Sequence, residues 1–485
     1  MRRRSAAAAL ALALAGAGCS LAPKYRRPEA PVAAAFPAAP PAAQPGAVPA
    51  SELGWRDVFG DPRLQALLAL ALEQNRDLRV ATLNVELVQA QYRIQRAQRL
   101  PTLNGYASAT WQRIPARLST TGSVTNAEAW SVGAAVTGFE LDLWGRVKSL
   151  SDAALEQYFS TDEARRAAQL SLVAQVANQY LALRSLDAQV VLARSTLEAV
   201  AASAALTRRS TEAGRTAEID LRTAESQVET ARFNLALAEQ QRALAQDALQ
   251  LLVGGTIPAD LPEPLPLDAQ PLVADLPAGI PSEVLVRRPD VLAAEHALEA
   301  ANANIGAARA AFLPRIALPA SGGTGSTALW GIFGAAGGSG AWAFTPSITQ
   351  PIFQGGALLA NLDAAHVRKK IQIAQYEGAI QGAFREVADA LQSRGWIEQQ
   401  LQAQTARVAA EQERFRLSDR RYRAGIDPYL TVLTAQRDLF AAQQQLIQTR
   451  LAKLSNLVGL YKALGGGWKE RTETAAAAQG TAAGG

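Results

Sequence analysis

The chain is 485 residues long, and 49% of these are apolar and 19% charged, which is enough apolar material to exclude wholesale disorder. The formal net charge of +5 includes Arg2, Arg3 and Arg4, which belong to a segment that we expect to be removed, so the charge does not predict nucleic-acid binding. Because Cys19 is the sole cysteine and the chain has two histidines, composition argues against disulfide scaffolds, Cys-rich metal sites and Cys/His catalysis. We expect no enzyme, no metal and no noncovalent cofactor.

Residues 1–18 have the pattern of an export signal peptide. An arginine-rich start precedes an Ala/Leu run, and Gly16-Ala17-Gly18 leads directly to Cys19. This arrangement resembles the lipobox of bacterial lipoproteins, although Gly16 stands where that pattern usually has leucine. The resemblance implies that Cys19 carries an S-diacylglycerol and an N-acyl chain, and that Ser20 after it directs the protein to the outer membrane. The alternative is an ordinary signal, cleaved near Ala17, with an unmodified Cys19.

The segments outside the main body are rich in proline or in small residues. From residue 30 to 50 the Ala and Pro composition predicts an extended tether, within a lipidated N-terminal segment spanning residues 19–60. Eight prolines between residues 258 and 289 exclude a helix or a central strand there and predict a connecting, equatorial segment. Residues 467–485 are rich in Ala, Gly and Thr and are predicted to form a disordered tail.

The main body of the chain repeats itself once. Residues 75–101 align with residues 288–314, and each of these windows ends in Leu-Pro. Each repeat continues with a weakly charged stretch and then with two long helices on either side of an Ala-Gly pair. The first repeat spans residues 61–257 and the second spans residues 290–466. Identities between the aligned windows include Asp77 with Asp290, Glu86 with Glu299, and Arg96 with Arg309.

The stretch after each Leu-Pro alternates as a β-strand does. In residues 102–112 and 130–137 apolar or small residues alternate with polar ones, and Trp342, Phe344 and Ile348 alternate likewise in the second repeat. Strands of about ten residues with an apolar outer face fit a transmembrane β-barrel, although half-buried strands of a soluble sandwich have a similar pattern. The expected elements are two strands near 102–143, two strands near 315–352, and exposed loops over 114–126 and 322–340.

Long helices are indicated by apolar residues that recur every seven positions. Such a repeat predicts supercoiled helices, and about 50 residues of it, from near Thr161 to Ala213, correspond to about 75 Å of helix. On the helices alone, a soluble coiled-coil tether or dimer explains the pattern equally well. The series are Val176, Leu183, Val190 and Leu197 in the first repeat and Leu433, Phe440, Ile447 and Leu454 in the second.

Four strands per chain cannot close a barrel. Because every backbone edge inside a membrane must be paired, several chains have to pool their strands. A homotrimer supplies twelve strands, an even number that encloses a water-filled lumen. The predicted fold is therefore a mixed one, in which three chains share a twelve-stranded β-barrel and each chain adds two long helical hairpins to an α-helical barrel.

A series of motifs, met in order along the chain, resembles the outer membrane factor family of TolC-like efflux proteins. The motifs include Gly54-Trp-Arg-Asp-Val-Phe59, Phe139-Glu-Leu-Asp-Leu-Trp-Gly-Arg146, Arg287-Arg-Pro-Asp290, Pro351-Ile-Phe-Gln-Gly-Gly356 and Tyr422-Arg-Ala-Gly425. The likeness is strongest to the OprM-type lipoprotein branch and runs from Cys19 to about Leu464. It implies a homotrimeric tunnel that sits in outer-membrane lipid, extends into the periplasm, and meets a periplasmic adaptor (membrane fusion) protein and an inner-membrane pump of the resistance-nodulation-division type.

The function that this resemblance implies is a passive duct for export of drugs or other small toxic molecules. Such a duct needs no catalytic residue and no nucleic-acid partner, because the pump supplies the energy. The alternative function is a structural coiled-coil adhesin or periplasmic tether, which leaves the duplicated strand pairs without a role. A tether should give no discrete conductance in a planar bilayer.

The resemblance also places a periplasmic gate at the tips of the helical hairpins, beside the Ala-Gly pairs that end at Gly214 and Gly425. A ring of charges or of leucines at this level would narrow the pore and select ions. Thr434 stands where close relatives carry aspartate, so an acidic ring is either missing or supplied by Asp427. The alternative role for each residue is to cap or solvate a helix end. By position, the gate candidates are Asp220 and Arg222 on the first hairpin, and Tyr422, Asp427, Leu430, Thr434 and Arg437 on the second.

Two other features predict structural roles. His296 lies among small and apolar residues of an expected helix, with no second metal ligand nearby, which predicts a packed or surface histidine. The Arg287-Arg-Pro-Asp290 motif has proline and aspartate where a helix begins, which favours a helix start over a substrate site.

Overall fold

The computed structural model describes residues 20–33, 35–36, 49–120, 122–273, 287–333 and 339–472. These residues form two compact units, and each unit draws on both sequence repeats. The first unit takes the described parts of Met1–Glu29, Asn84–Thr161 and Ala293–Tyr376, and the second takes those of Ala30–Leu83, Asp162–Leu292 and Glu377–Gly485. The signal segment 1–18 and Cys19 lie outside the described residues.

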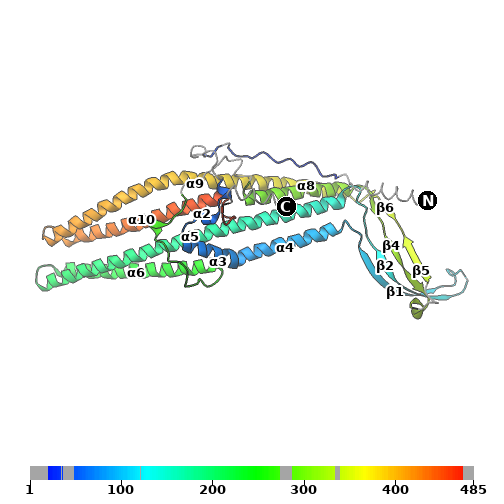
Figure 1. Cartoon of the computed structure of the whole chain (residues 1–485), viewed down its shortest axis with the longest axis horizontal. Helices are drawn as coiled ribbons and strands as arrows, with labels where there is room; N and C mark the ends of the chain where they lie inside the picture. Colours follow the sequence, from blue (N-terminus) through cyan, green and yellow to red (C-terminus); the bar gives the residue numbers. More distant parts are fainter. Residues whose placement is uncertain are drawn as a thin grey trace, which may run out of the picture. The chain divides into compact units, whose positions relative to one another are not determined.

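The first unit contains an antiparallel sheet of four strands in the order β1-β2-β4-β5 (Figure 1). The strands are β1 (Leu103–Ile114), β2 (Thr125–Val136), β4 (Ala320–Ser326) and β5 (Ser339–Phe344). Its two halves come from the two repeats and meet where β2 pairs with β4, from Trp130 opposite Ser326 to Val136 opposite Ala320. A second, two-stranded sheet joins β3 (Arg315–Ala317) to β6 (Ser347–Thr349), and the short helix η3 (Leu329–Ile332) follows β4.

The sheet corrects the predicted loop over 322–340. Residues 322–326 belong to β4 and residues 339–340 belong to β5, so the loop is shorter at both ends. The glycines that suggested a loop instead allow β2 and β4 to approach closely. A Cβ atom added to Gly133 would lie 2.4 Å from the carbonyl oxygen of Gly322, and one added to Gly323 would lie 2.3 Å from that of Val132. Only glycine fits these positions.

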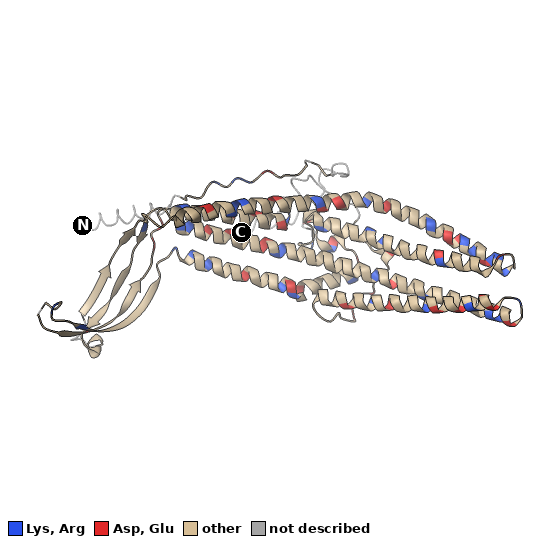
Figure 2. Ribbon diagram, turned by 180° about the vertical axis from the view of Figure 1, so that it is seen from behind, with Lys and Arg blue, Asp and Glu red and all other residues tan. Residues whose placement is uncertain are grey.

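The two faces of the sheet differ in polarity. Leu103 and Trp111 project from one face of β1 and are 73% and 63% exposed, whereas Ser108 on the other face lies 2.7 Å from Ser131 of β2. The four strands carry two charged residues, Arg113 and Glu128, both close to the β1–β2 turn (Figure 2). The predicted alternation of the first repeat's strands is therefore present in the fold.

The helices of the first unit are joined to its sheet by a motif noted in the sequence. Asp142 accepts hydrogen bonds from the backbone amides of Arg146 and Lys148 and so caps the start of α5 (Arg146–Glu212). The Arg146 guanidinium makes a bidentate ion pair with Glu140 at 2.8 and 2.6 Å. Trp144 donates its indole N–H to the carbonyl oxygen of Pro314 at 2.9 Å, which links the two repeats.

The N-terminal segment of the first unit binds along α8 (Pro289–Ala310). Arg27 makes a bidentate ion pair with Glu295 at 2.6 and 2.8 Å. Further along the helix, Asn302 donates to the carbonyl oxygen of Pro23, and Arg309 donates to that of Leu21. The described residues of this segment therefore run antiparallel to α8. We call residues 20–28 the strap.

The second unit contains two long helical hairpins. The first pairs the later part of α5 with α6 (Glu218–Val253), and the second pairs α9 (Ala357–Arg423) with α10 (Tyr429–Ala463). Both α5 and α9 have 67 residues, as expected for a duplicated chain. The predicted heptad residues Val176, Leu183 and Val190 are buried along α5. In the described part of the chain, α5 is also the one helix long and apolar enough to cross a membrane, by length and composition.

The core of the second unit forms where the hairpins meet the N-terminal elements. Asp61 caps α3 (Pro62–Gln74), and its carboxylate also accepts a 2.6 Å hydrogen bond from the hydroxyl of buried Tyr180. Trp55 and Tyr461 are also buried in this core. The remaining elements of this unit are η1 (Ala50–Glu52), α2 (Trp55–Val58) and η2 (Leu267–Ala269). Helix α4 (Arg76–Ala97) follows α3 and divides between the units, with residues from Asn84 onward in the first.

Two predictions about the termini need correction. Phe36, inside the predicted tether, is buried and stacks on Phe384 with ring centroids 5.0 Å apart. The start of the predicted disordered tail is also ordered. Residues 469–472 bind α2 and the residue before it, through hydrogen bonds such as that from Gly54 N–H to Thr472 Oγ1 at 3.0 Å. Gly54 permits this approach, because a Cβ there would lie 2.3 Å from Cα of Arg471. Residues 473–485 lie outside the described residues.

Candidate gate at the hairpin tips

Both hairpins of the second unit turn at a glycine in the left-handed region. Gly214 has φ +71° and Gly425 has φ +72°. In each turn the amide after the glycine bonds back across the helix end, from Arg215 N to Ser210 O at 2.8 Å and from Ile426 N to Arg421 O at 2.9 Å. This is the Schellman termination of a helix, which favours glycine because other residues are strained at positive φ. The structure thus places both predicted tip glycines in helix-ending turns.

The two hairpins contact one another just behind these turns. Tyr429, at the start of α10, is buried, and its hydroxyl lies 3.2 Å from Ser203 Oγ on α5. Its ring lies 5.1 Å from that of half-buried Tyr422 on α9. Burial raises the pKa of Tyr429, so the hydroxyl stays protonated and able to donate. We call the buried set the tip cluster; it consists of Ala224, Tyr429, Val432 and Leu433.

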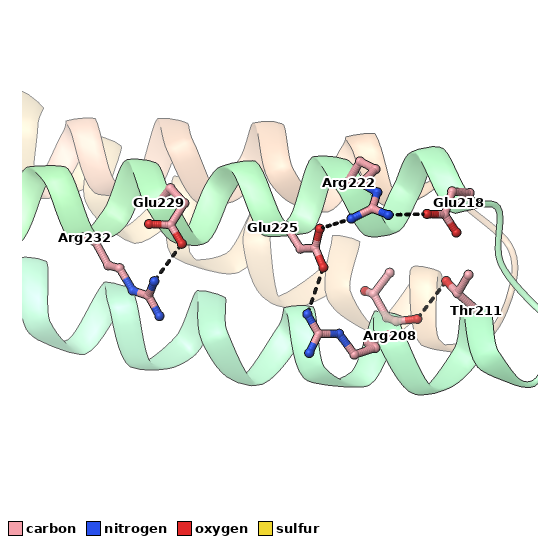
Figure 3. Close-up of polar contacts among 8 residues, drawn as sticks. Arg208, Thr211, Glu218, Arg222, Glu225, Glu229 and Arg232 are labelled. Carbon is pink, nitrogen blue, oxygen red and sulfur yellow. Dashed lines mark hydrogen bonds and ion pairs between the residues drawn. The ribbon is translucent and has the colours of Figure 1, made fainter.

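The tip of the first hairpin carries a chain of ion pairs (Figure 3). Arg222 contacts Glu218 at 2.8 Å and Glu225 at 2.9 Å, and Glu225 also contacts Arg208 on α5 at 2.8 Å. The arginines lower the pKa of Glu225, Arg208 contributing most. Asp220 is half-buried, and its charge adds to the electrostatic field around Tyr429. The predicted gate residue Arg222 is therefore held by carboxylates of its own hairpin.

The tip of the second hairpin is also held by local ion pairs. Arg421 makes a bidentate contact with Asp427 at 2.7 and 2.9 Å, and the guanidinium lowers the pKa of Asp427. Asp438 makes ion pairs with Arg414 of α9 at 2.7 Å and with Arg437 at 3.1 Å. These contacts keep both aspartates ionised at neutral pH.

The remaining candidates of the second tip are two uncharged residues. Leu430 is 68% exposed, so it is available for contacts outside the chain. Thr434 donates its hydroxyl to the carbonyl oxygen of Leu430 at 2.9 Å, within the same helix. At the position where an acidic ring was considered, the chain therefore has the Thr434 hydroxyl, which is hydrogen-bonded within its own helix.

Sequence reasoning missed Tyr429 and Asp438, although both lie beside predicted residues. Tyr429 follows Pro428, and an aromatic residue at a proline-capped helix start was a usable signal. Asp438 follows Arg437 directly and pairs with it. Tyr422 and Tyr429 are brought together, whereas Arg222 and Arg437 each pair within their own hairpin.

The prediction that His296 has no second ligand nearby is wrong. Nδ1 of His296 lies 2.7 Å from Oε2 of Glu156, and Glu299 lies beside them. Glu299 could have been found in the sequence, because it lies three positions after His296 on the same helix. Glu156 could not, because it is 140 positions away and reaches His296 only when α5 packs on α8.

Paired helical hairpins of matched length, joined to a four-stranded antiparallel sheet, define a TolC-like outer membrane channel fold. The open-state MtrE outer membrane channel of Neisseria gonorrhoeae has this fold; it matches with a TM-score of 0.85 at 42% identity, over 94% of this chain and 100% of that one.

The sequence comparisons agree with the fold. Residues 67–255 and 280–466 match the sequence profile named outer membrane efflux protein. The chain is 49% identical over 459 residues to the toluene efflux pump outer membrane protein TtgC of Pseudomonas putida, with 94% of both chains covered. It is 44% identical over 452 residues to the outer membrane protein OprJ of Pseudomonas aeruginosa, with 93% of this chain and 94% of that one covered. The chain therefore belongs to the outer membrane efflux protein family, which confirms the resemblance noted in its motifs.

Proposed function

We propose that this chain is the outer-membrane channel of a tripartite efflux pump and works as a homotrimeric, passive duct. The observation that carries this proposal is the four-stranded sheet of the first unit. β1 forms one edge with twelve residues and β5 forms the other. An unpaired edge in hydrocarbon leaves backbone groups without hydrogen bonds, at several kcal/mol each, so the sheet requires further copies to close it.

The side chains of the sheet support a place in the membrane. Trp342 and Phe344 on β5 are 83% and 55% exposed. Leu103 and Trp111 on β1 are exposed to a similar extent. The few charges lie near the β1–β2 turn, where a membrane-spanning strand would leave the lipid. Three copies supply twelve strands, which is within the range of water-filled barrels.

The strap supports a lipid anchor on Cys19. Arg309 binds the carbonyl oxygen of Leu21, two residues after the cysteine, and α8 ends at Ala310, shortly before β3. Acyl chains on Cys19 would therefore start close to the base of the sheet. They would contribute about 0.8 kcal/mol per buried methylene to membrane attachment. Cys19→Ser should lose metabolic palmitate labelling while the trimer still inserts; palmitate on the variant, or none on the wild type, would count against the anchor.

The helical hairpins support the partners that we propose. Their tips expose Leu430 and several arginines, among them Arg215, Arg222 and Arg423, which a periplasmic adaptor protein can contact. The motor would be an inner-membrane pump of the resistance-nodulation-division type, so the duct itself performs no chemistry. The tip cluster and the flanking ion pairs are the proposed periplasmic gate.

The proposed cargo consists of small toxic organic molecules. TtgC is named for toluene efflux, and other relatives, at 46% and 49% identity, are named for solvents and for antibiotics. A water-filled duct shared by such compounds sets little selectivity of its own, so the choice of cargo is assigned to the pump.

The test combines mass and conductance. The detergent-extracted protein should have the mass of three chains and should give discrete single-channel currents in a planar bilayer. A folded monomer would overturn the trimer. A trimer without discrete currents would favour the coiled-coil tether.

A further inference from the structure

Three metal-ligating side chains meet between α5 and α8 of the first unit. Glu156 comes from α5, and His296 and Glu299 lie about one turn apart on α8. One ligand atom from each residue lies within 4.8 Å of the other two, and the closest pair is His296 Nδ1 and Glu156 Oε2 at 2.7 Å. All three side chains are half-buried, and the Phe159 ring lies 5.4 Å from the imidazole. The group is therefore preassembled and partly shielded from water.

The carboxylates in and beside the cluster differ in their pairing. The neighbouring acid Glu295 is already paired with Arg27 at 2.6 Å. The Glu299 carboxylate, in contrast, makes no hydrogen bond or ion pair with any residue in the described ranges. The three side chains together offer an imidazole nitrogen and carboxylate oxygens within 4.8 Å of one another, which is a mixed nitrogen and oxygen donor set for one divalent cation.

We propose that Glu156, His296 and Glu299 form a binding site for a divalent transition metal, with Zn²⁺ as the ion that fits best. One imidazole nitrogen and two carboxylate oxygens are a donor set that zinc accepts, with a fourth position left for water. The imidazole disfavours Mg²⁺ and Ca²⁺, which take oxygen ligands.

The required rearrangement is small. Zinc at about 2.0–2.2 Å from each donor needs donor atoms about 3.3 Å apart, so the 2.7 Å pair must open and the wider separations must close. When Nδ1 of His296 takes the metal, a proton held in its hydrogen bond with Glu156 is released to water, so zinc binding is coupled to proton release. Rotations of three partly exposed side chains supply these movements without a change of backbone.

Such an ion would join the two sequence repeats. Glu156 belongs to the first repeat, whereas His296 and Glu299 belong to the second. Because the metal binds the folded arrangement and not the separated helices, it should stabilise the first unit in proportion to its occupancy. None of the three residues belongs to the proposed gate, so the inference does not depend on the proposed function.

The test uses full-length, untagged protein in detergent, stripped with EDTA and titrated with zinc chloride by calorimetry. We expect about one zinc per chain and a raised thermal unfolding temperature. His296→Gln and Glu299→Gln should each weaken zinc binding at least tenfold. Glu299→Gln is the informative variant, because its carboxylate bonds to none of the described residues, so we expect the substitution to leave the metal-free fold undisturbed. Magnesium chloride should give no comparable binding.

The chain offers a matched control in His366, its only other histidine. His366→Gln should bind zinc as the wild type does. The proposal fails if the stripped protein takes up no stoichiometric zinc, if Glu299→Gln binds zinc unchanged, or if His366→Gln weakens binding as much as His296→Gln does.

Discussion

Tyr429→Phe should favour the open state of the channel. The substitution keeps the buried ring and its contact with Tyr422 but removes the hydroxyl that lies 3.2 Å from Ser203 on the other hairpin. A hydrogen bond of this kind contributes about 0.5–1.5 kcal/mol. If opening separates the hairpins in all three chains, the closed state loses about 1.5–4.5 kcal/mol, and the opening equilibrium shifts by about tenfold to a thousandfold.

The assay is single-channel recording of the purified protein in a planar bilayer, with the open fraction as the measured quantity. Ser203→Ala should have a similar effect, and the double variant should add little, because both changes remove the same bond. Ser195→Ala is the control, since the Ser195 hydroxyl on the same helix donates to Leu192 O within α5. An unchanged open fraction in Tyr429→Phe, or an equal rise in Ser195→Ala, would refute the reasoning.

Three further outcomes test the sheet, the tip and the start of α5. Gly133→Ala should prevent β2–β4 pairing and abolish the detergent-resistant trimer on gels, whereas Gly105→Ala, where an added Cβ meets nothing within 4 Å, should preserve it. Thr434→Asp should add one carboxylate per chain at the tips and raise cation selectivity, seen as a shifted reversal potential in a salt gradient; no shift would contradict this. Glu140→Gln should lower stability by about 1–2 kcal/mol at pH 7. Because Arg146 lowers the pKa of Glu140, that contribution exists above the unfolded pKa and disappears as pH falls through the lower, folded-state pKa, so the stabilities of wild type and variant should converge at acid pH in denaturant titrations.

Local patterns were sufficient to predict the helices and the hairpin turns. The seven-residue repeat through Val176 and Leu183 indicates a buried apolar stripe along the helix. Such a stripe can be recognised in the sequence of one helix, without knowing which helix packs against it. The turns at Gly214 and Gly425 could likewise be predicted, because a helix that ends at positive φ favours glycine whatever the rest of the fold is.

Features that depend on residues far apart in the sequence could not be predicted in this way. Gly323 suggested a loop because glycine weakens an isolated strand, whereas its close approach to Val132 and Gly133 in the paired strand makes glycine necessary. His296 and Glu156 meet only through helix packing. The contact of Tyr429 with Ser203 could not be predicted either, because Ser203 lies 226 positions earlier in the chain.

The strap has a consequence for the order in which the chain folds. Its residues are synthesised first, yet they bind Glu295, Asn302 and Arg309, which lie 268 to 288 positions later. The earliest residues of the chain must therefore wait for almost two thirds of it before they find their partners. Contacts of such long sequence separation form slowly from a free coil, so holding the N-terminus near the assembly site would shorten the search. The strap can therefore dock only late in folding, after α8 has formed.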